Sequence, residues 1–167
     1  MKKIIIILFI IMFISVLINE KKEILIPDNS IRFRIIANSN SKEDQKLKLD
    51  IKKEVEKELY KVLNNTNNIE EARIKITNNL DMVDNILNKY NLSYDISYGD
   101  NYFPIKEYKG VSYDAGNYES LVITLGEGNG ENWWCVLFPP LCLLDENENL
   151  SSAEYDFYAK KLINKIK

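Results

Sequence analysis

The sequence predicts an α+β domain preceded by a membrane-targeting segment. Three observations indicate this class. An apolar run opens the chain, two stretches in the first half carry apolar residues at helical spacing, and several shorter stretches alternate apolar and polar residues as strands do. We therefore expect a signal peptide or membrane anchor over residues 1–22 and a single α+β domain over residues 30–167.

The N-terminal segment has the composition of a membrane-targeting sequence. Lys2 and Lys3 precede an apolar run from Ile4 to Ile18, and charged residues follow from Glu20. A spanning helix needs about 20 apolar residues and the apolar part of a signal peptide about 7 to 15, so this run fits either an uncleaved anchor or a cleaved signal. A small-x-small cleavage signature is missing near Ser15, which favours the anchor. The alternative, a buried core helix, is disfavoured because every face is apolar.

The first strand is predicted over residues 31–36, followed by a helix. One face of the strand carries Ile31, Phe33 and Ile35, and the other carries Arg32 and Arg34. Ser41 is placed to cap the helix, with acidic residues in its first turn. Its apolar stripe consists of Leu47, Ile51, Val55, Leu59 and Val62. A second helix is expected from Ile69 to Tyr90 after an Asn-rich connection, so the two helices should form an antiparallel pair.

Strands are predicted after the helices. Residues 94–98 alternate Tyr and Ile with small polar residues, whereas residues 101–109 contain Pro104 and are expected to be irregular. Residues 121–125 alternate again. Three glycines within residues 126–130 then favour a tight turn, so this strand and the following aromatic strand over residues 133–138 are predicted to form a β-hairpin.

The chain is expected to end in a short amphipathic helix that starts at Ser151 or Ser152. On the preceding aromatic strand, Trp133 and Trp134 must point to opposite sides, because successive strand residues do. One of them can fill the core while the other is covered by another element or contacts a partner. The simpler interpretation buries both rings.

The composition excludes several kinds of chemistry. The 167 residues include no His, which removes Ser-His-Asp and Cys-His catalysis and every His-containing metal site. The formal net charge is -3 with both signs interspersed, so no nucleic-acid partner is expected. The glycine-rich segment opens a strand rather than a helix and therefore does not fit a phosphate-binding loop. We expect no catalytic residues, metal, cofactor or small-molecule substrate.

The two cysteines fit a disulfide. Cys135 and Cys142 lie in a segment that the targeting sequence should send across a membrane, where disulfides persist. A bridge between them would close a short loop containing Pro139 and Pro140 and contribute on the order of 2 to 3 kcal/mol. The alternative is a pair of buried free thiols that pack as small apolar groups.

Two segments carry a specific resemblance to a known family. The first reads Arg32-x-Arg34-x-x-Ala37-Asn38-Ser39-x-x-x-x-Asp44-Gln45-x-x-Lys48, and the second reads Gly-Glu-Gly-x-Gly-x-Asn-Trp-Trp-Cys-Val-Leu-Phe-Pro-Pro-Leu-Cys over residues 126–142. With them the chain resembles the stage II sporulation protein R family from Ile31 to Asp145, together with the targeting segment.

The resemblance implies an intercellular signal without catalysis of its own. Members of that family are made in the forespore and exported into the space between forespore and mother cell. There they trigger SpoIIGA, a membrane-embedded aspartic protease that cleaves the precursor of sigma factor E. The resemblance thus implies a receptor protease as partner, and a mature protein that is either membrane-anchored through its N-terminal segment or secreted.

The same motifs supply candidate site residues. The partner-binding candidates are Asn132, Trp133, Trp134, Gly128 and Gly130. The candidates for a structural network between the first strand and the first helix are Arg32, Arg34, Asn38, Asp44 and Gln45. Two other classes stay open, namely a hydrolase with a carboxylate pair in a cleft and a structural protein of the septum.

Overall fold

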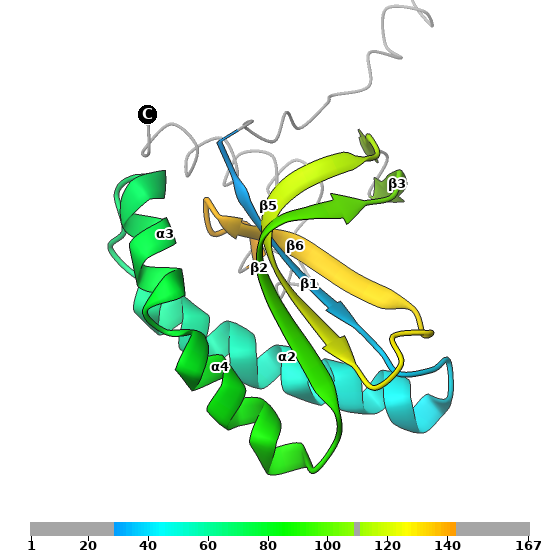
Figure 1. The fold of residues 1–167 in the computed structure, drawn as a ribbon. Helices are drawn as coiled ribbons and strands as arrows, with labels where there is room; N and C mark the ends of the chain where they lie inside the picture. The colour runs from blue at the N-terminus through cyan, green and yellow to red at the C-terminus, as the bar shows by residue number, and fades with distance from the viewer. Residues whose placement is uncertain (1–28, 109–110, 143–167) are drawn as a thin grey trace, which may run out of the picture.

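The computed structural model describes residues 29–108 and 111–142, which form a mixed sheet with helices on one face (Figure 1). The elements are β1 (Ile31–Ile36), α2 (Lys42–Leu63), α3 (Ile69–Thr77), α4 (Leu80–Leu87), β2 (Tyr94–Phe103), β3 (Lys106–Tyr108), β4 (Val111–Tyr113), β5 (Gly116–Leu125) and β6 (Asn132–Phe138). The predicted α+β class is confirmed. The predicted targeting segment and terminal helix lie outside the described residues.

The four-stranded sheet has the order β2-β5-β1-β6, and β3 and β4 form a separate two-stranded sheet. β1 pairs in parallel with β5 and antiparallel with β6. The predicted hairpin between the strands flanking the glycine-rich segment is therefore wrong, because β1 lies between them. Ile36 pairs with both Thr124 and Asn132, so the glycine-rich segment crosses the end of β1 instead of reversing the chain between neighbours.

The helices cover one face of the sheet (Figure 1). Ser41 caps α2 by accepting a hydrogen bond from the backbone N–H of Asp44 at 3.0 Å, as predicted. The predicted second helix is instead two helices, because the chain breaks at Asn78 and Asn79. The Asn79 side chain donates to the Lys75 carbonyl oxygen at 2.8 Å, and such side-chain bonds to the backbone compete with helix continuation.

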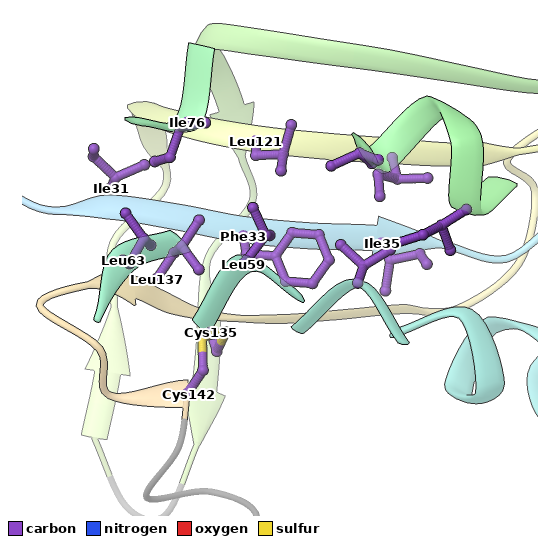
Figure 2. Packing of buried hydrophobic residues seen from close by; sticks show 14 of the residues in the cluster. Ile31, Phe33, Ile35, Leu59, Leu63, Ile76, Leu121, Cys135, Leu137 and Cys142 are labelled. Atoms are coloured by element: carbon purple, nitrogen blue, oxygen red, sulfur yellow. A yellow bond between two sulfur atoms is a disulfide. The ribbon is translucent and has the colours of Figure 1, made fainter. Parts of the chain in front are cut away.

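The core lies between the sheet and the helices (Figure 2). The side chains of Ile31, Phe33 and Ile35 are buried in it, which confirms the predicted apolar face of β1. Other members of this cluster are Leu59 and Leu63 from α2, Ile76 from α3, Leu121 from β5, and Leu137 from β6. Burial of such side chains stabilises the fold by roughly 1.5–3 kcal/mol each.

The edge strand β2 is longer than the alternating pattern of its sequence predicted. It continues through Asn101 to Phe103, where an irregular stretch was predicted, because these residues pair with the first half of β5. Phe103 is buried there, and Pro104 ends the strand because it has no N–H to donate. Among the described residues, none of the helices combines the length and apolar character needed to cross a membrane.

Candidate partner interface

The two distinctive sequence motifs meet at the end of β1. Hydrogen bonds connect the loop after β1 to the crossing, the glycine-rich segment over residues 126–131. They run from Gly130 N to Ala37 O at 2.9 Å, Ala37 N to Glu131 O at 3.4 Å, Asn129 N to Asn38 O at 3.0 Å, Glu127 N to Asn38 Oδ1 at 3.0 Å, and Glu131 N to Asn40 Oδ1 at 2.7 Å. The loop and the crossing therefore form one hydrogen-bonded unit, which fixes where β6 enters the sheet.

Two glycines of the crossing have structural reasons for being glycine. Gly128 adopts a φ of +65°, which residues with a side chain rarely do. A Cβ on Gly130 would lie 2.7 Å from the Ser39 carbonyl carbon and 2.9 Å from the Ala37 Cβ. The backbone of the crossing therefore already requires glycine at both Gly128 and Gly130, which the sequence analysis named as candidates for partner binding.

Asn38, Asp44 and Gln45 come together in a network at the start of α2. Asp44 Oδ2 accepts hydrogen bonds from Ser39 Oγ at 2.6 Å and Asn38 Nδ2 at 2.9 Å, which hold the pKa of its carboxyl below the usual value. Gln45 Nε2 donates to Ser39 O at 2.9 Å. Lys48 extends the network, since its Nζ lies 2.6 Å from Gln45 Oε1 and 3.0 Å from Glu131 O.

Arg32 and Arg34 lie apart from this network, on the sheet face away from the helices. Arg32 is 4% exposed, and its guanidinium lies 3.3 Å from the ring centroid of Tyr118, with Trp134 at 5.0 Å and Phe103 at 5.3 Å. Stacking of this kind holds the rings in place around the cation. The prediction that both arginines lie on one face of β1 is confirmed. Their aromatic partners on β2 and β5 are distant in the sequence, so the spacing of residues around β1 did not indicate them.

A pocket of about 300 Å³ opens beside this cluster. Its lining residues are Arg34, Phe103, Pro104, Ile105, Glu131, Asn132 and Trp134. Arg34 Nη1 donates to the Tyr102 carbonyl oxygen at 3.2 Å, and burial lowers the pKa of its guanidinium. Within residues 29–108 and 111–142, no carboxylate lies at ion-pair distance from Arg34. Ile105 at the rim is 68% exposed.

The tryptophan pair is divided between the two faces, and both rings are half-buried. Trp134 lines the pocket with Asn132, whereas Trp133 points to the helices. The Trp133 ring lies 5.9 Å from that of Phe33 and 4.3 Å from Lys52 Nζ. The structure therefore brings only two of the five partner-binding candidates, Asn132 and Trp134, to the pocket. Arg34, which the sequence analysis named as a candidate for the structural network, also lines this pocket.

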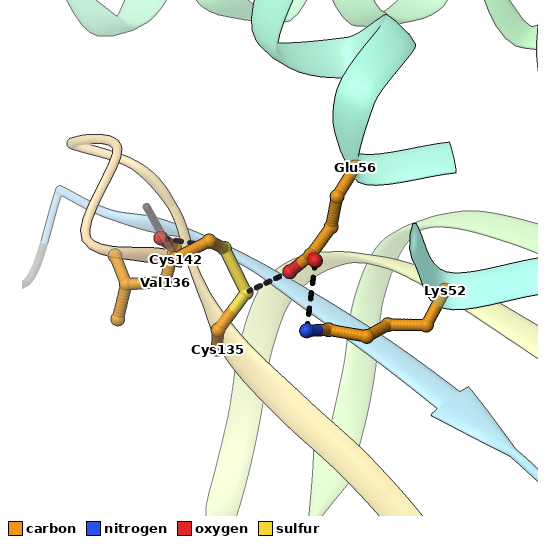
Figure 3. Close-up of a disulfide and its surroundings, with 5 residues drawn as sticks. All are labelled: Lys52, Glu56, Cys135, Val136 and Cys142. Atoms are coloured by element: carbon orange, nitrogen blue, oxygen red, sulfur yellow. Dashed lines mark hydrogen bonds and ion pairs between the residues drawn. A yellow bond between two sulfur atoms is a disulfide. The ribbon is translucent and has the colours of Figure 1, made fainter. Parts of the chain in front are cut away.

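A disulfide joins Cys135 to Cys142, whose Cα atoms are 5.3 Å apart (Figure 3). Glu56 Oε1 from α2 lies 3.9 Å from Cys135 Sγ, and Glu56 Oε2 pairs with Lys52 Nζ at 2.9 Å. Glu56 and the two cysteines are close enough to surround one metal ion, but both sulfurs are committed to the bridge and offer no thiolate. Sequence reasoning missed Glu56 because only the sheet contact distinguishes it from other charges on α2.

Comparison with known proteins decides the family. The model of the family described as stage II sporulation protein R matches residues 27–148, which include both motifs, the pocket and the disulfide. This chain belongs to the stage II sporulation protein R family. The curated stage II sporulation protein R of Bacillus subtilis (strain 168) is 40% identical over 156 residues, covering 89% of this chain and 70% of that protein. No solved structure matches. The family resemblance stated from the sequence is thus confirmed.

Proposed function

We propose that this protein is an exported intercellular sporulation signal that activates the membrane aspartic protease SpoIIGA. Activation triggers cleavage of the sigma factor E precursor in the mother cell. Membership of the stage II sporulation protein R family carries this proposal, since it gives the chain a role in stage II of sporulation. On this proposal the protein crosses into the space between forespore and mother cell, where it is held by residues 1–22 or released.

The proposal assigns binding, not catalysis, to the domain. Glu119 on β5 accepts hydrogen bonds from Arg73 that lower the pKa of its carboxyl, and it also accepts one from the Tyr98 hydroxyl at 3.0 Å. Asp44 is engaged in the network at the start of α2. Groups held in this way support the fold. A signal of this kind acts by binding the active arrangement of its receptor more tightly than the resting one.

We assign receptor binding to the pocket around Arg34. It combines a cation that has no carboxylate partner among the described residues with an aromatic wall from Trp134 and an exposed apolar rim at Ile105. Arg and Trp are the residues that most often dominate binding energy when an interface covers them. A receptor segment with a carboxylate beside an apolar side chain has the matching chemistry.

Deletion of the gene followed by immunoblotting of the sigma factor E precursor tests the function. We expect the precursor to persist. Normal cleavage in the deletion strain would contradict the signal function and support a passive role in the septum.

Two substitutions in the restored gene test the surface. Arg34→Met removes the charge but keeps an apolar stem, and Ile105→Ala trims the rim; each should cost about 2 kcal/mol of receptor binding and leave precursor uncleaved. Ile74→Ala is the matched control, because Ile74 is 62% exposed but lies on α3, across the sheet from the pocket. Loss of cleavage with Ile74→Ala, or normal cleavage with both pocket variants, would remove the pocket from the mechanism.

A further inference from the structure

The neighbours of the Cys135–Cys142 disulfide suit its reduced form as well as its oxidised form. Cys142 Sγ lies 3.1 Å from the Val136 carbonyl oxygen, and Cys135 Sγ lies 3.9 Å from Glu56 Oε1 (Figure 3). A bridged sulfur has no hydrogen, so neither contact is a hydrogen bond while the disulfide is intact. After reduction each thiol has an acceptor in place. Opening the bridge therefore leaves neither buried thiol without a hydrogen-bond acceptor.

Glu56 and Lys52 connect Cys135 to the solvent. Their side chains are 7% and 15% exposed, and the ion pair between them spans 2.9 Å. A proton can thus pass from water to Lys52, from Lys52 to Glu56, and from Glu56 to the sulfur. An ion pair buried this deeply contributes little net stability, because desolvation offsets the attraction. Its position against the disulfide is the feature that requires explanation.

The second cysteine, Cys142, is at the wall of a groove between α2 and the end of β6. The groove has a volume of about 390 Å³, and Cys142 lines it whereas Cys135 does not. Lys53, Lys57 and Lys61 stand along its rim at successive turns of α2, and all three are exposed. A row of ammonium groups attracts an anionic nucleophile and favours the thiolate form of an approaching thiol.

We propose that the Cys135–Cys142 disulfide is a thiol–disulfide exchange site whose reaction partner is a dithiol. A thiolate of the dithiol enters the lysine-rimmed groove and attacks Cys142 Sγ. The bond between the two sulfurs breaks, and its electron pair goes to Cys135 Sγ. Lys52 transfers a proton to the Glu56 carboxylate, Glu56 passes it to Cys135 Sγ, and Lys52 regains a proton from water.

The second thiol of the partner completes the exchange. It attacks the mixed disulfide as a thiolate, so that Cys142 leaves, takes a proton from solvent and donates its S–H to Val136 O. The partner is oxidised to a disulfide and the domain is reduced to two thiols. In the reverse direction a disulfide-bearing partner oxidises the two thiols, and Glu56 accepts the proton of Cys135. This exchange is independent of the receptor interaction proposed above.

Reduction kinetics of the full-length chain test the proton relay. Dithiothreitol is the probe, and thiols are trapped with a maleimide and counted by mass. Glu56→Gln, which cannot pass a proton, should slow reduction about tenfold or more, and Glu56→Asp should restore part of the rate. In denaturant all three proteins should react equally. An unchanged or faster rate for folded Glu56→Gln would overturn the relay, because loss of a repelling carboxylate would then be the dominant effect.

A second variant tests the groove without disturbing the core. Lys57→Glu should slow reduction by an anionic thiol, mercaptoethanesulfonate, several-fold more than reduction by the cationic thiol cysteamine. Lys42→Glu makes the same charge change at an exposed position about 22 Å away along α2, and should alter both rates alike. Equal effects of the two variants would overturn attack through the groove. This result does not depend on whether Glu56→Gln folds.

Discussion

Gly130→Ala tests the idea that close contact between the crossing and the loop after β1 positions β6. The added Cβ would lie 2.7 Å from the Ser39 carbonyl carbon and closer still to its oxygen, where ordinary contacts exceed about 3.4 Å. Because neither the Ser39 carbonyl nor the Ala37 Cβ can rotate away, the crossing must move by roughly 1 Å. That movement disrupts the bonds from Gly130 N to Ala37 O and from Lys48 Nζ to Glu131 O, which measure 2.9 and 3.0 Å.

The size of the effect follows from these bonds. A neutral hydrogen bond contributes about 0.5–1.5 kcal/mol and one from a charged group about 1.5–3 kcal/mol. Loss of one of each, with some relaxation, predicts a decrease of about 2–4 kcal/mol in the free energy of unfolding. Urea unfolding at an unchanged slope gives this difference from the shift in midpoint.

Gly116→Ala is the matched control, since a Cβ there meets the Tyr118 ring at 3.5 Å, an ordinary contact. This variant should stay within about 0.5 kcal/mol of the wild type. If Gly130→Ala were as stable as Gly116→Ala, close approach would not be the reason for the glycine. The hydrogen bonds of the crossing would then contribute little to the placement of β6.

Two further predictions concern the network and the tryptophan pair. The pKa of Asp44 is lowered by folding, so its contribution is present above the pKa of the unfolded chain and is lost as pH falls through the folded value. The difference in unfolding free energy between wild type and Asp44→Asn should therefore shrink between about pH 5 and pH 2, and a constant difference in urea unfolding would contradict the assignment. Trp133→Ala should lower the unfolding free energy by about 3 kcal/mol through loss of contacts with Phe33 and Lys52. Trp134→Ala should lower it by about 1–2 kcal/mol yet block precursor cleavage, and normal cleavage by this variant would remove Trp134 from the receptor surface.

Local features of the fold were predictable because they depend on neighbouring residues. The alternation in β1 and the cap at Ser41 are of this kind. Strand order was not predictable in the same way, because β1 inserts between two strands that are joined by a short connection. Tertiary contacts also decide that the first motif is split between two places: Asn38, Asp44 and Gln45 lie at the start of α2, whereas Arg32 and Arg34 lie on the other face of the sheet. Sequence spacing showed that these residues form a motif, but it did not show that the motif serves two separate sites.

The central position of β1 has a consequence for how the chain acquires its structure under the proposed export. β1 precedes the other strands of the sheet, yet Phe33 pairs with Leu121 on one side and with Cys135 on the other. A chain that crosses a membrane with its N-terminus leading presents β1 first and its two partners last. Pairing at such long sequence separation is slow, because the intervening loop must close before the contacts form. The sheet is therefore completed only after residue 138 has emerged, so a chain whose transfer stops earlier lacks β6 and, with it, the complete pocket and the disulfide.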